Sequence, residues 1–131
     1  MDKPISVLLV DDRPEFLEAA RAWLENDPAR HVVGTARNGR EAIDAVARLA
    51  PDLVLMDAFM PLMDGFVATA AIKSGPRAPI VILLSVHAGE AMEAKAGAAG
   101  ADGFVPKDQF ASRLPGLLRR FFGPVVASPG T

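Results

Sequence analysis

The sequence predicts a doubly wound α/β domain with a five-stranded parallel sheet, and two patterns carry this prediction. Apolar strand-like runs alternate with amphipathic helix-like segments along the chain, which is typical of βα units and a parallel sheet. Three of the runs, over residues 7–10, 53–56 and 80–84, are continuously apolar, as strands covered on both faces are. The run His31–Ala36 is more polar, so we expect it at an edge of the sheet. A short run, Phe104-Val105, predicts the last strand.

Three of the predicted helices begin at clear start signals, one after each of the first three strands. Pro14 suits a first helical position, because the N–H that proline lacks would have no partner there. Asn38, followed three residues later by Glu41, resembles a capping box for the second helix. Asp64 can accept a hydrogen bond from the first turn of the third helix.

The last two helices contain residues that weaken helices. The fourth, over residues 90–99, contains Gly97, and an interior glycine costs about 1 kcal/mol relative to alanine. We therefore expect it to be the least stable helix. The fifth contains Pro115, which breaks a helix interior but is tolerated in the first turn. This predicts Ser112 as the N-cap of the fifth helix.

Length and composition restrict the class of protein. The 131 residues suffice for one domain, predicted over residues 1–122, with 123–131 as a tail or the start of a linker. The longest aliphatic run has five residues, over 80–84, which is too short to span a bilayer. No apolar signal region precedes the first strand, and the chain has no cysteine for disulfides or thiolate metal sites. We expect a cytoplasmic protein without membrane association.

The charge pattern argues against nucleic acid as a direct partner. The net charge is −2, and the 14 basic and 16 acidic residues are well mixed along the chain. Binding to nucleic acid requires many cations that neutralise phosphates, and no stripe of Lys or Arg is present. We expect no direct binding to DNA or RNA.

Polar residues follow four of the five predicted strands. Asp11 and Asp12 follow the first run, Asp57 the third and Ser85 the fourth, and Lys107 lies just beyond the last. In an open parallel sheet, ligands bind outside the carboxyl ends of the strands. We therefore expect these five side chains to converge at one edge of the sheet.

The three carboxylates indicate a site for a cation and a phosphoryl group. Carboxylates brought together repel, so they either take up protons or bind a cation, and hard oxygen ligands suit Mg²⁺. Lys107 would supply a positive charge opposite them. A metal and a lysine around one carboxylate stabilise a transferring phosphoryl group. Asp57 is then the candidate nucleophile, forming an aspartyl phosphate, and Ser85 a candidate hydrogen-bond donor to a phosphoryl oxygen.

The order and spacing of these motifs resemble those of response-regulator receiver domains over about residues 5–122. The matching pieces are Leu9-Val10-Asp11-Asp12, Asp57 with Met60-Pro61-Leu62-Met63-Asp64-Gly65, Leu84-Ser85, residues 98–104 and Lys107. The resemblance implies a flavodoxin-like sheet with strand order 2-1-3-4-5. It also implies that a histidine kinase or phosphotransfer protein phosphorylates Asp57, that Asp11 and Asp12 help to hold Mg²⁺, and that Lys107 contacts the phosphoryl group. Such a domain is a phosphoacceptor that assists its own modification, not a conventional enzyme.

The resemblance further implies a conformational switch. Ser85 and Phe104 correspond to the hydroxyl residue and the rotating aromatic of the family, although Phe104 is equally well explained as a core aromatic. Movement of this pair would repack the surface formed by the fourth helix, the fifth strand and the fifth helix. Receivers use that surface for an output domain, a downstream protein or a homodimer.

Four positions depart from the common family pattern. Asp108 follows Lys107, as in receivers joined to helix-turn-helix DNA-binding domains, yet no such domain follows here, so the chain is either a stand-alone receiver or part of a longer protein. Phe59, Val86 and His87 stand where receivers tune the hydrolysis of the phosphoryl group. We expect slow self-dephosphorylation.

Three alternatives compete with this interpretation. A flavodoxin-like cofactor binder would need a Gly/Ser/Thr-rich phosphate loop where Asp11 and Asp12 stand, and an aspartyl phosphatase would need a carboxylate where Phe59 stands. Both are disfavoured. The stronger rival is a receiver-shaped binding module that works without phosphorylation, which Phe59 and Val86 keep open.

Overall fold

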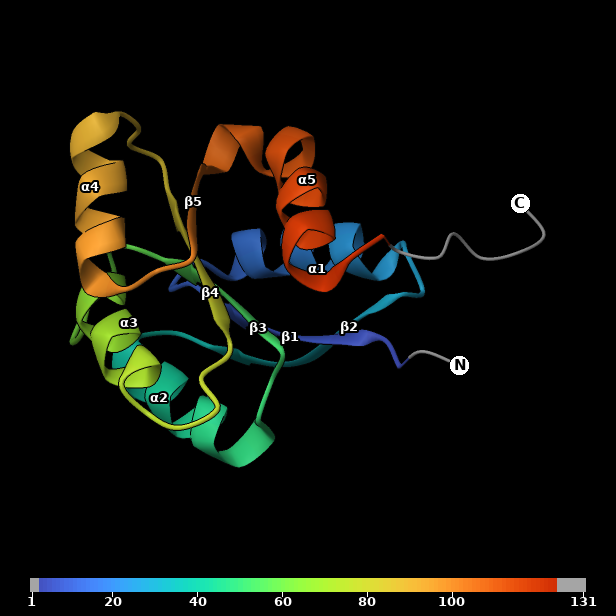
Figure 1. Ribbon diagram of the computed structural model, residues 1–131, viewed down its shortest axis with the longest axis horizontal. Coiled ribbons are helices and arrows are strands. Elements are labelled where there is room, and N and C mark those ends of the chain that lie inside the picture. Colours follow the sequence, from blue (N-terminus) through green and yellow to red (C-terminus); the bar gives the residue numbers. More distant parts are fainter. Residues whose placement is uncertain (1–2, 125–131) are drawn as a thin grey trace.

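The computed structural model describes residues 3–124 and contains a single five-stranded parallel sheet in the order β2-β1-β3-β4-β5 (Figure 1). The predicted strand order is therefore correct, and the more polar strand lies at an edge. Every residue of β3, at the centre of the sheet, is buried. The strand bounds are β1 (Ile5–Val10), β2 (Arg30–Ala36), β3 (Leu53–Asp57), β4 (Ile80–Ser85) and β5 (Gly103–Pro106).

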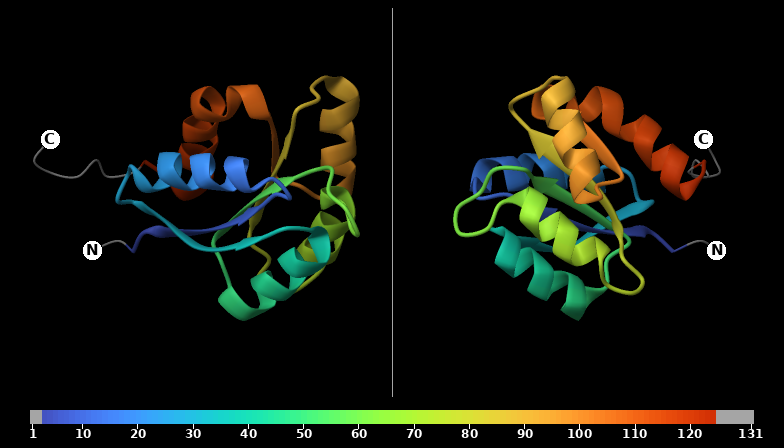
Figure 2. Two further views of the ribbon diagram at one scale, coloured as in Figure 1. Left: turned by 180° about the vertical axis from the view of Figure 1, so that it is seen from behind. Right: turned by 60° about the vertical axis from the view of Figure 1, so that its left-hand side comes forward.

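Five α-helices cover the two faces of the sheet. The helix bounds are α1 (Pro14–Glu25), α2 (Gly39–Leu49), α3 (Gly65–Lys73), α4 (Glu90–Ala99) and α5 (Phe110–Phe122). Figure 2 shows α1 and α5 on one side of the sheet and α2, α3 and α4 on the other. This arrangement leaves the carboxyl ends of the strands, called the carboxyl edge below, bordered only by loops and helix starts.

The predicted start signals act as expected in α2 and α3. The Asn38 side chain accepts a hydrogen bond from the Glu41 backbone N–H at 2.9 Å, and Asp64 accepts one from the Val67 N–H at 2.8 Å. Each side chain satisfies a first-turn donor that would otherwise lack a partner. Both loops are thereby held at fixed positions near the carboxyl edge.

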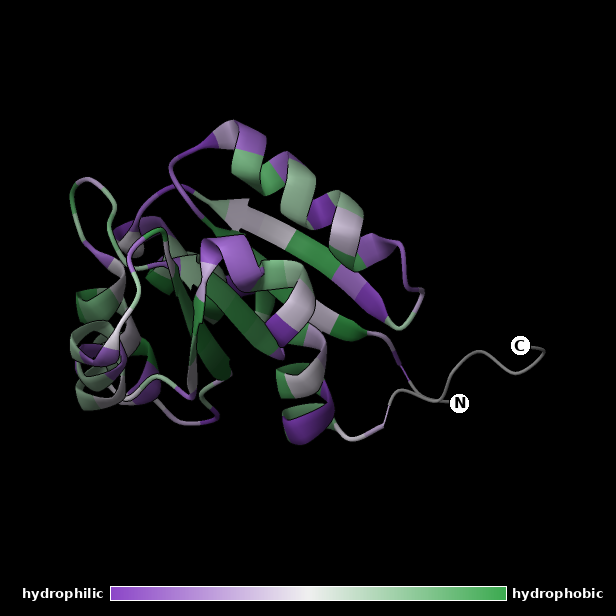
Figure 3. Ribbon diagram, turned by 90° about the horizontal axis from the view of Figure 1, so that it is seen from above, coloured by the Kyte–Doolittle hydropathy of each residue, from purple (hydrophilic) through white to green (hydrophobic). Residues whose placement is uncertain are grey.

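Two apolar clusters, one on each face of the sheet, stabilise the fold. The cluster beneath α1 and α5 is centred on Leu9, Leu55 and Leu84, and the cluster beneath α2, α3 and α4 on Met56 and Leu83. In Figure 3 the strands in the interior of the sheet are largely green, whereas the helices carry both green and purple segments. Burial of apolar area on both faces fixes the positions of the strand ends that carry polar residues.

The start of α5 corrects one prediction. The helix begins at Phe110 rather than after Ser112, so Pro115 lies inside it. Phe110 is buried and makes an edge-to-face contact with Trp23 of α1 at 5.2 Å between ring centroids. Packing of this ring against α1 favours the earlier start and outweighs the hydrogen bond that Pro115 cannot donate. Ser112 instead donates its hydroxyl to the Gln109 carbonyl at 3.2 Å.

The C-terminal boundary of the domain, expected at residue 122, stays a prediction. α5 ends at Phe122, and Gly123 has a φ of 80° at its C-cap. The predicted tail lies outside the described residues from residue 125 onward. Between residues 3 and 124, no helix has both the length and the apolar character that crossing a membrane requires.

A candidate phosphoacceptor site at the carboxyl edge

Three carboxylates meet at the carboxyl edge. Asp11 follows β1 and Asp57 ends β3, and these two strands are neighbours in the sheet. One carboxylate oxygen from each of Asp11, Asp12 and Asp57 lies within 4.8 Å of the other two. Asp11 is fully buried and Asp57 nearly so, whereas Asp12 is exposed. The sequence prediction that these side chains converge therefore agrees with the geometry.

Among the residues that the structure describes, Lys107 forms the ion pairs with this cluster. It begins a short 3-10 turn, η1 (Lys107–Gln109), directly after β5, and its Nζ lies 2.6 Å from Asp11 Oδ2 and 3.7 Å from Asp57 Oδ2. The contact with Asp11 is an ion pair without hydrogen-bond geometry, so among the described residues Asp11 Oδ2 has no hydrogen-bond donor. One ammonium against three carboxylates leaves an excess of negative charge.

The excess negative charge alters the proton affinity of Asp57. The pKa of Asp57 is raised from 3.8 to about 6, chiefly by burial of the carboxylate and also by the nearby charges of Asp11 and Asp12. The Lys107 ammonium and the backbone N–H of Phe59 act in the opposite direction and offset only part of the increase. Without a further cation, the ionised form of Asp57 is thus disfavoured in the folded protein.

The donor set fits a hard divalent cation such as Mg²⁺. All the converging ligand atoms are carboxylate oxygens, and the fully buried Asp11 Oδ2 lacks a hydrogen-bond donor within residues 3–124. A cleft of about 200 Å³ opens beside Asp12 and Asp57 and leaves room for water ligands, which Mg²⁺ usually keeps. A second positive charge would also relieve the repulsion among the carboxylates.

The remaining walls of the cleft come from the loops after β1, β3 and β4. They include Ser85 and three residues singled out in the sequence, Phe59, Val86 and His87. Ser85 is buried, and its Oγ accepts a hydrogen bond from the His87 backbone N–H at 3.0 Å. Phe59 and His87 make an edge-to-face ring contact at 5.9 Å, while Val86 is 65% exposed. These residues border the path from solvent to Asp57.

Phe104 lies apart from the cleft. Its side chain is buried in the apolar cluster on the α4 side of the sheet, together with Ala96. This is an inward orientation of the aromatic ring. The placement is compatible with both explanations of Phe104, as a core aromatic and as one state of a switch.

Two residues at the site were not recognised as functional from the sequence. A Cβ added to Gly65 would lie 2.3 Å from the Asp57 carbonyl oxygen, so the start of α3 presses against the backbone of Asp57. Phe16 of α1 places its ring 4.4 Å from the Lys107 Nζ. The sequence shows Gly65 only as the last residue of the motif that begins at Met60, and it does not single out Phe16, because contacts between distant segments leave no local signal.

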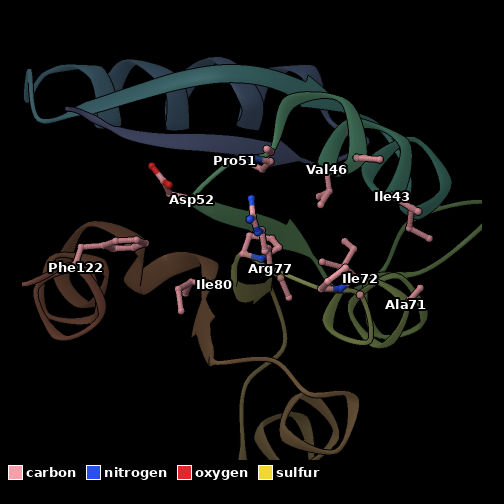
Figure 4. Close-up of a pocket in the computed structure, with 15 residues that line it drawn as sticks. Ile43, Val46, Pro51, Asp52, Ala71, Ile72, Arg77, Ile80 and Phe122 are labelled. Atoms are coloured by element: carbon pink, nitrogen blue, oxygen red, sulfur yellow. The ribbon is translucent and has the colours of Figure 1, made fainter.

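A larger hollow lies at the opposite edge of the sheet, near the amino ends of β3 and β4. It has a volume of about 700 Å³, and its lining is mostly apolar, with Asp52 and Arg77 as its charged members (Figure 4). The Asp52 carboxylate already accepts hydrogen bonds from the backbone N–H and the hydroxyl of Ser6. The larger hollow thus lacks a cluster of chemically active groups, and charge rather than size locates the site.

Comparison with known proteins agrees with this geometry. The family profile of the response regulator receiver domain matches residues 7–119. The chain belongs to the receiver family. It is a receiver domain of a two-component response regulator, a signalling domain, and the comparisons lend no support to the phosphorylation-independent alternative.

Solved receivers share this fold closely. A two-component response regulator of the LuxR family from a species of Aurantimonas superposes with a TM-score of 0.84 at 31% identity, over 91% of this chain and 85% of that one. The response regulator domain of CheB from Thermotoga maritima gives a TM-score of 0.80 at 30% identity, over 92% of this chain and 95% of that one.

The matching full-length relatives are longer proteins. A protein-glutamate methylesterase/protein-glutamine glutaminase from Moorella thermoacetica is 40% identical over 98% of this receiver, which corresponds to 30% of the relative. This chain spans 23% to 32% of the length of the protein-glutamate methylesterases that it matches. The shared part is therefore the receiver.

Replacing the Asp57 carboxyl should stabilise the metal-free receiver at neutral pH. Because the pKa of Asp57 is raised to about 6 in the folded state, ionisation of this carboxyl lowers the free energy of unfolding. The loss grows as pH rises from about 4 to 6 and is complete above that range. The free energy of unfolding of Asp57→Asn should therefore equal that of the wild type near pH 4. Above pH 6 it should be higher, by at most about 3 kcal/mol. Thermal melts from pH 4 to 8 would measure this difference in stability. Mg²⁺ should reduce it, because a bound cation compensates the charge of Asp57.

Asp44→Asn provides the control for this pH series. Asp44 is an exposed carboxyl on α2, so its replacement should give a difference from the wild type that does not vary with pH in the same way. If the difference in stability between Asp57→Asn and the wild type did not change between pH 4 and 8, the raised pKa of Asp57 would be contradicted.

A side chain at Gly65 should disturb the site and the fold together. The Cβ of Gly65→Ala would meet the Asp57 carbonyl at 2.3 Å, so α3 or Asp57 must shift, with a loss of about 1–3 kcal/mol. Gly97→Ala in α4 is the matched control: nothing lies within 4 Å of its added Cβ, and the helix should gain about 1 kcal/mol. Urea unfolding would measure both, and equal effects of the two substitutions would contradict the close approach at Gly65.

Proposed function

We propose that Asp57 accepts a phosphoryl group from a phosphohistidine of a histidine kinase or phosphotransfer protein. The observation that carries the proposal is the buried Asp57 carboxylate, with two further carboxylates and the Lys107 ammonium around it, at the mouth of a cleft. Because the charge of this carboxylate is only partly compensated, its oxygen is able to act as a nucleophile, which a fully paired structural carboxylate is not. The receiver unit in this proposal spans residues 1–122.

The transfer is a substitution at phosphorus. An Asp57 carboxylate oxygen attacks the phosphorus of the donor, the P–O bond forms as the P–N bond breaks, and the leaving imidazole of the donor takes up a proton. The product is an aspartyl phosphate. Because the pKa of Asp57 is raised to about 6, a bound cation would lower it again and keep the nucleophile ionised over a wider pH range.

Asp11, Asp12 and Asp57 would hold Mg²⁺. The ion, when bound, would neutralise charge on the phosphoryl oxygens during transfer. Asp11 is oriented for this role by the Arg13 backbone N–H, which donates to Asp11 Oδ1 at 2.9 Å and leaves Oδ2 facing the cluster. Asp12 is exposed, so it would reach the ion from the solvent side.

Lys107 and Ser85 would bind the phosphoryl group itself. The Lys107 ammonium, 3.7 Å from Asp57 Oδ2, would pair with a phosphoryl oxygen and compensate its charge. The Ser85 hydroxyl uses its oxygen as an acceptor for the His87 N–H, so its own proton is available to donate to a phosphoryl oxygen. Asp57 is therefore a substrate whose neighbours assist its modification, and the chain acts as a signalling domain rather than a conventional enzyme.

The response to phosphorylation would involve Ser85, Phe104 and α4. Ser85 would move toward the new phosphoryl group, and the Phe104 ring, already buried beneath α4 in this structure, would hold this inward position in the phosphorylated state. α4 is suited to such movement because Ala96 is its single buried residue. The surface of α4, β5 and α5 would then bind an output domain, a downstream protein or a second copy of the chain. Because a histidine kinase uses ATP, donor and receiver would meet in the cytoplasm.

The proposal predicts a specific covalent modification. Incubation with Mg²⁺ and acetyl phosphate should add one phosphoryl group to the intact chain, as measured by mass spectrometry. Asp57→Asn should remain unmodified, as should the wild type after removal of Mg²⁺ by a chelator. Asp44→Asn, at an exposed position, should be modified like the wild type. Modification of Asp57→Asn to the same extent would refute Asp57 as the acceptor.

Phe59 should slow the loss of the phosphoryl group. The ring is 42% exposed and lines the cleft beside Asp57, where it restricts water that would attack the phosphorus. Phe59→Asn should shorten the lifetime of the aspartyl phosphate several-fold, as followed by the decay of the phosphorylated mass. Val67→Asn, an exposed apolar position on α3 outside the cleft lining, is the matched control. An unchanged lifetime in Phe59→Asn would remove Phe59 from this role.

A further inference from the structure

Within residues 3–124, the Lys107 ammonium has three close neighbours with charged or aromatic groups, and one of them is not a carboxylate. Asp11 Oδ2 lies 2.6 Å away and Asp57 Oδ2 3.7 Å away, while the centre of the Phe16 ring lies 4.4 Å from Nζ. A cation over an aromatic face is attracted by the negative charge of the ring, more strongly where water is excluded. The Lys107 side chain is only 10% exposed, so the ring of Phe16 supports the ammonium in a largely dry environment.

The Phe16 ring is also the first of three aromatic rings in contact across α1 and α5. Phe16 meets Phe110 at 5.8 Å and an interplanar angle of 89°, and Phe110 meets Trp23 at 5.2 Å and 76°. Both are edge-to-face arrangements within the favourable distance range. Arg30 at the start of β2 lies 4.6 Å from the far ring, that of Trp23. We call Phe16, Phe110 and Trp23 the aromatic series.

The backbone provides a second connection along the same route. Lys107 begins the η1 turn and Phe110 follows it as the first residue of α5, so the two residues are separated by a single short turn. Phe110 is buried between the two helices, whereas Trp23 is partly exposed on their surface. A displacement of Lys107 would therefore reach Phe110 both through the Phe16 ring and through the chain itself.

We propose that the ring of Phe16 positions the Lys107 ammonium at the phosphoacceptor site, and that the aromatic series transmits a change at this ammonium to the surface of α1 and α5. The inference rests on the proposed function, since phosphorylation of Asp57 is the event that would displace Lys107. A phosphoryl group adds negative charge on the Asp57 side of the ammonium and draws it away from the ring. Phe16 is accordingly a positioning residue that acts through Lys107. This route is separate from the one through Phe104 and α4.

The positioning role is tested by the rate of phosphorylation. Phe16→Leu keeps an apolar side chain but removes the aromatic face, and it should slow modification by acetyl phosphate about tenfold. Phe16→Tyr retains the face and should restore the rate. Phe121→Leu, a partly exposed aromatic of α5 outside the series, should leave the rate unchanged. A wild-type rate in Phe16→Leu, or an equal loss in Phe16→Tyr, would overturn the positioning role.

Transmission along the series is tested by fluorescence, because Trp23 is the only tryptophan of the chain. Addition of beryllofluoride and Mg²⁺, a phosphoryl mimic, should shift Trp23 emission in the wild type and in Phe121→Leu. The shift should disappear in Phe110→Leu and in Phe16→Leu, which break the series at different contacts. Thermal melts would establish that each variant is folded, and Phe16→Leu serves if burial makes Phe110→Leu unstable.

The two tests separate failure of this inference from failure of the proposed function. A wild type that accepts the phosphoryl group without any change in Trp23 emission, or with a change that persists in both broken variants, would overturn transmission alone. A wild type that takes up neither the phosphoryl group nor beryllofluoride would overturn the proposed function and this inference with it.

Discussion

The interaction on which the rest of the site depends is the ion pair between Lys107 and the buried carboxylates of Asp11 and Asp57. A buried carboxylate is costly unless a cation or hydrogen-bond donors compensate it, and here two such groups lie at the ends of adjacent strands. One ammonium compensates them only in part, as the raised pKa of Asp57 indicates. The folded protein thus retains a local excess of negative charge, and this excess is what a cation and an electrophilic phosphorus can relieve.

The fold supplies this arrangement by combining a rigid sheet with less tightly held surroundings. The strands that carry Asp11, Asp57 and Ser85 are buried on both faces, so their ends have little freedom to separate and reduce the repulsion. α4, by contrast, buries only Ala96 and contains Gly97. Repelling carboxylates are thus held together by a rigid sheet, and a weakly packed helix lies beside them. This combination allows a covalent change at the carboxylates to alter the position of the helix and the surface that it exposes.

Aromatic rings lie on both sides of the phosphoacceptor site. On one side the Phe16 ring lies against Lys107, and on the other Lys95 lies 4.5 Å from the ring of Phe66, which also contacts Phe59. The phosphoacceptor is therefore flanked by cation–aromatic contacts toward both faces of the sheet. The contact with Phe16 keeps the Lys107 ammonium near the site in a largely dry environment, whereas Lys95 is exposed. The two contacts connect the site to α1 and α5 in one direction and to α4 in the other.

The sequence by itself determined the central position of the three fully apolar strands, because such strands need cover on both faces. It also determined the convergence of Asp11, Asp12, Asp57, Ser85 and Lys107, because strand ends in a parallel sheet share one edge. The strand order followed from the resemblance to receiver domains. Only the tertiary structure decided the start of α5, since the buried ring of Phe110 packs against α1 and outweighs the local signals at Ser112 and Pro115. It also decided the partner of Lys107, the pKa of Asp57 and the close approach of Gly65. These depend on distances between segments that are far apart in the chain, and no local pattern of residues encodes such distances.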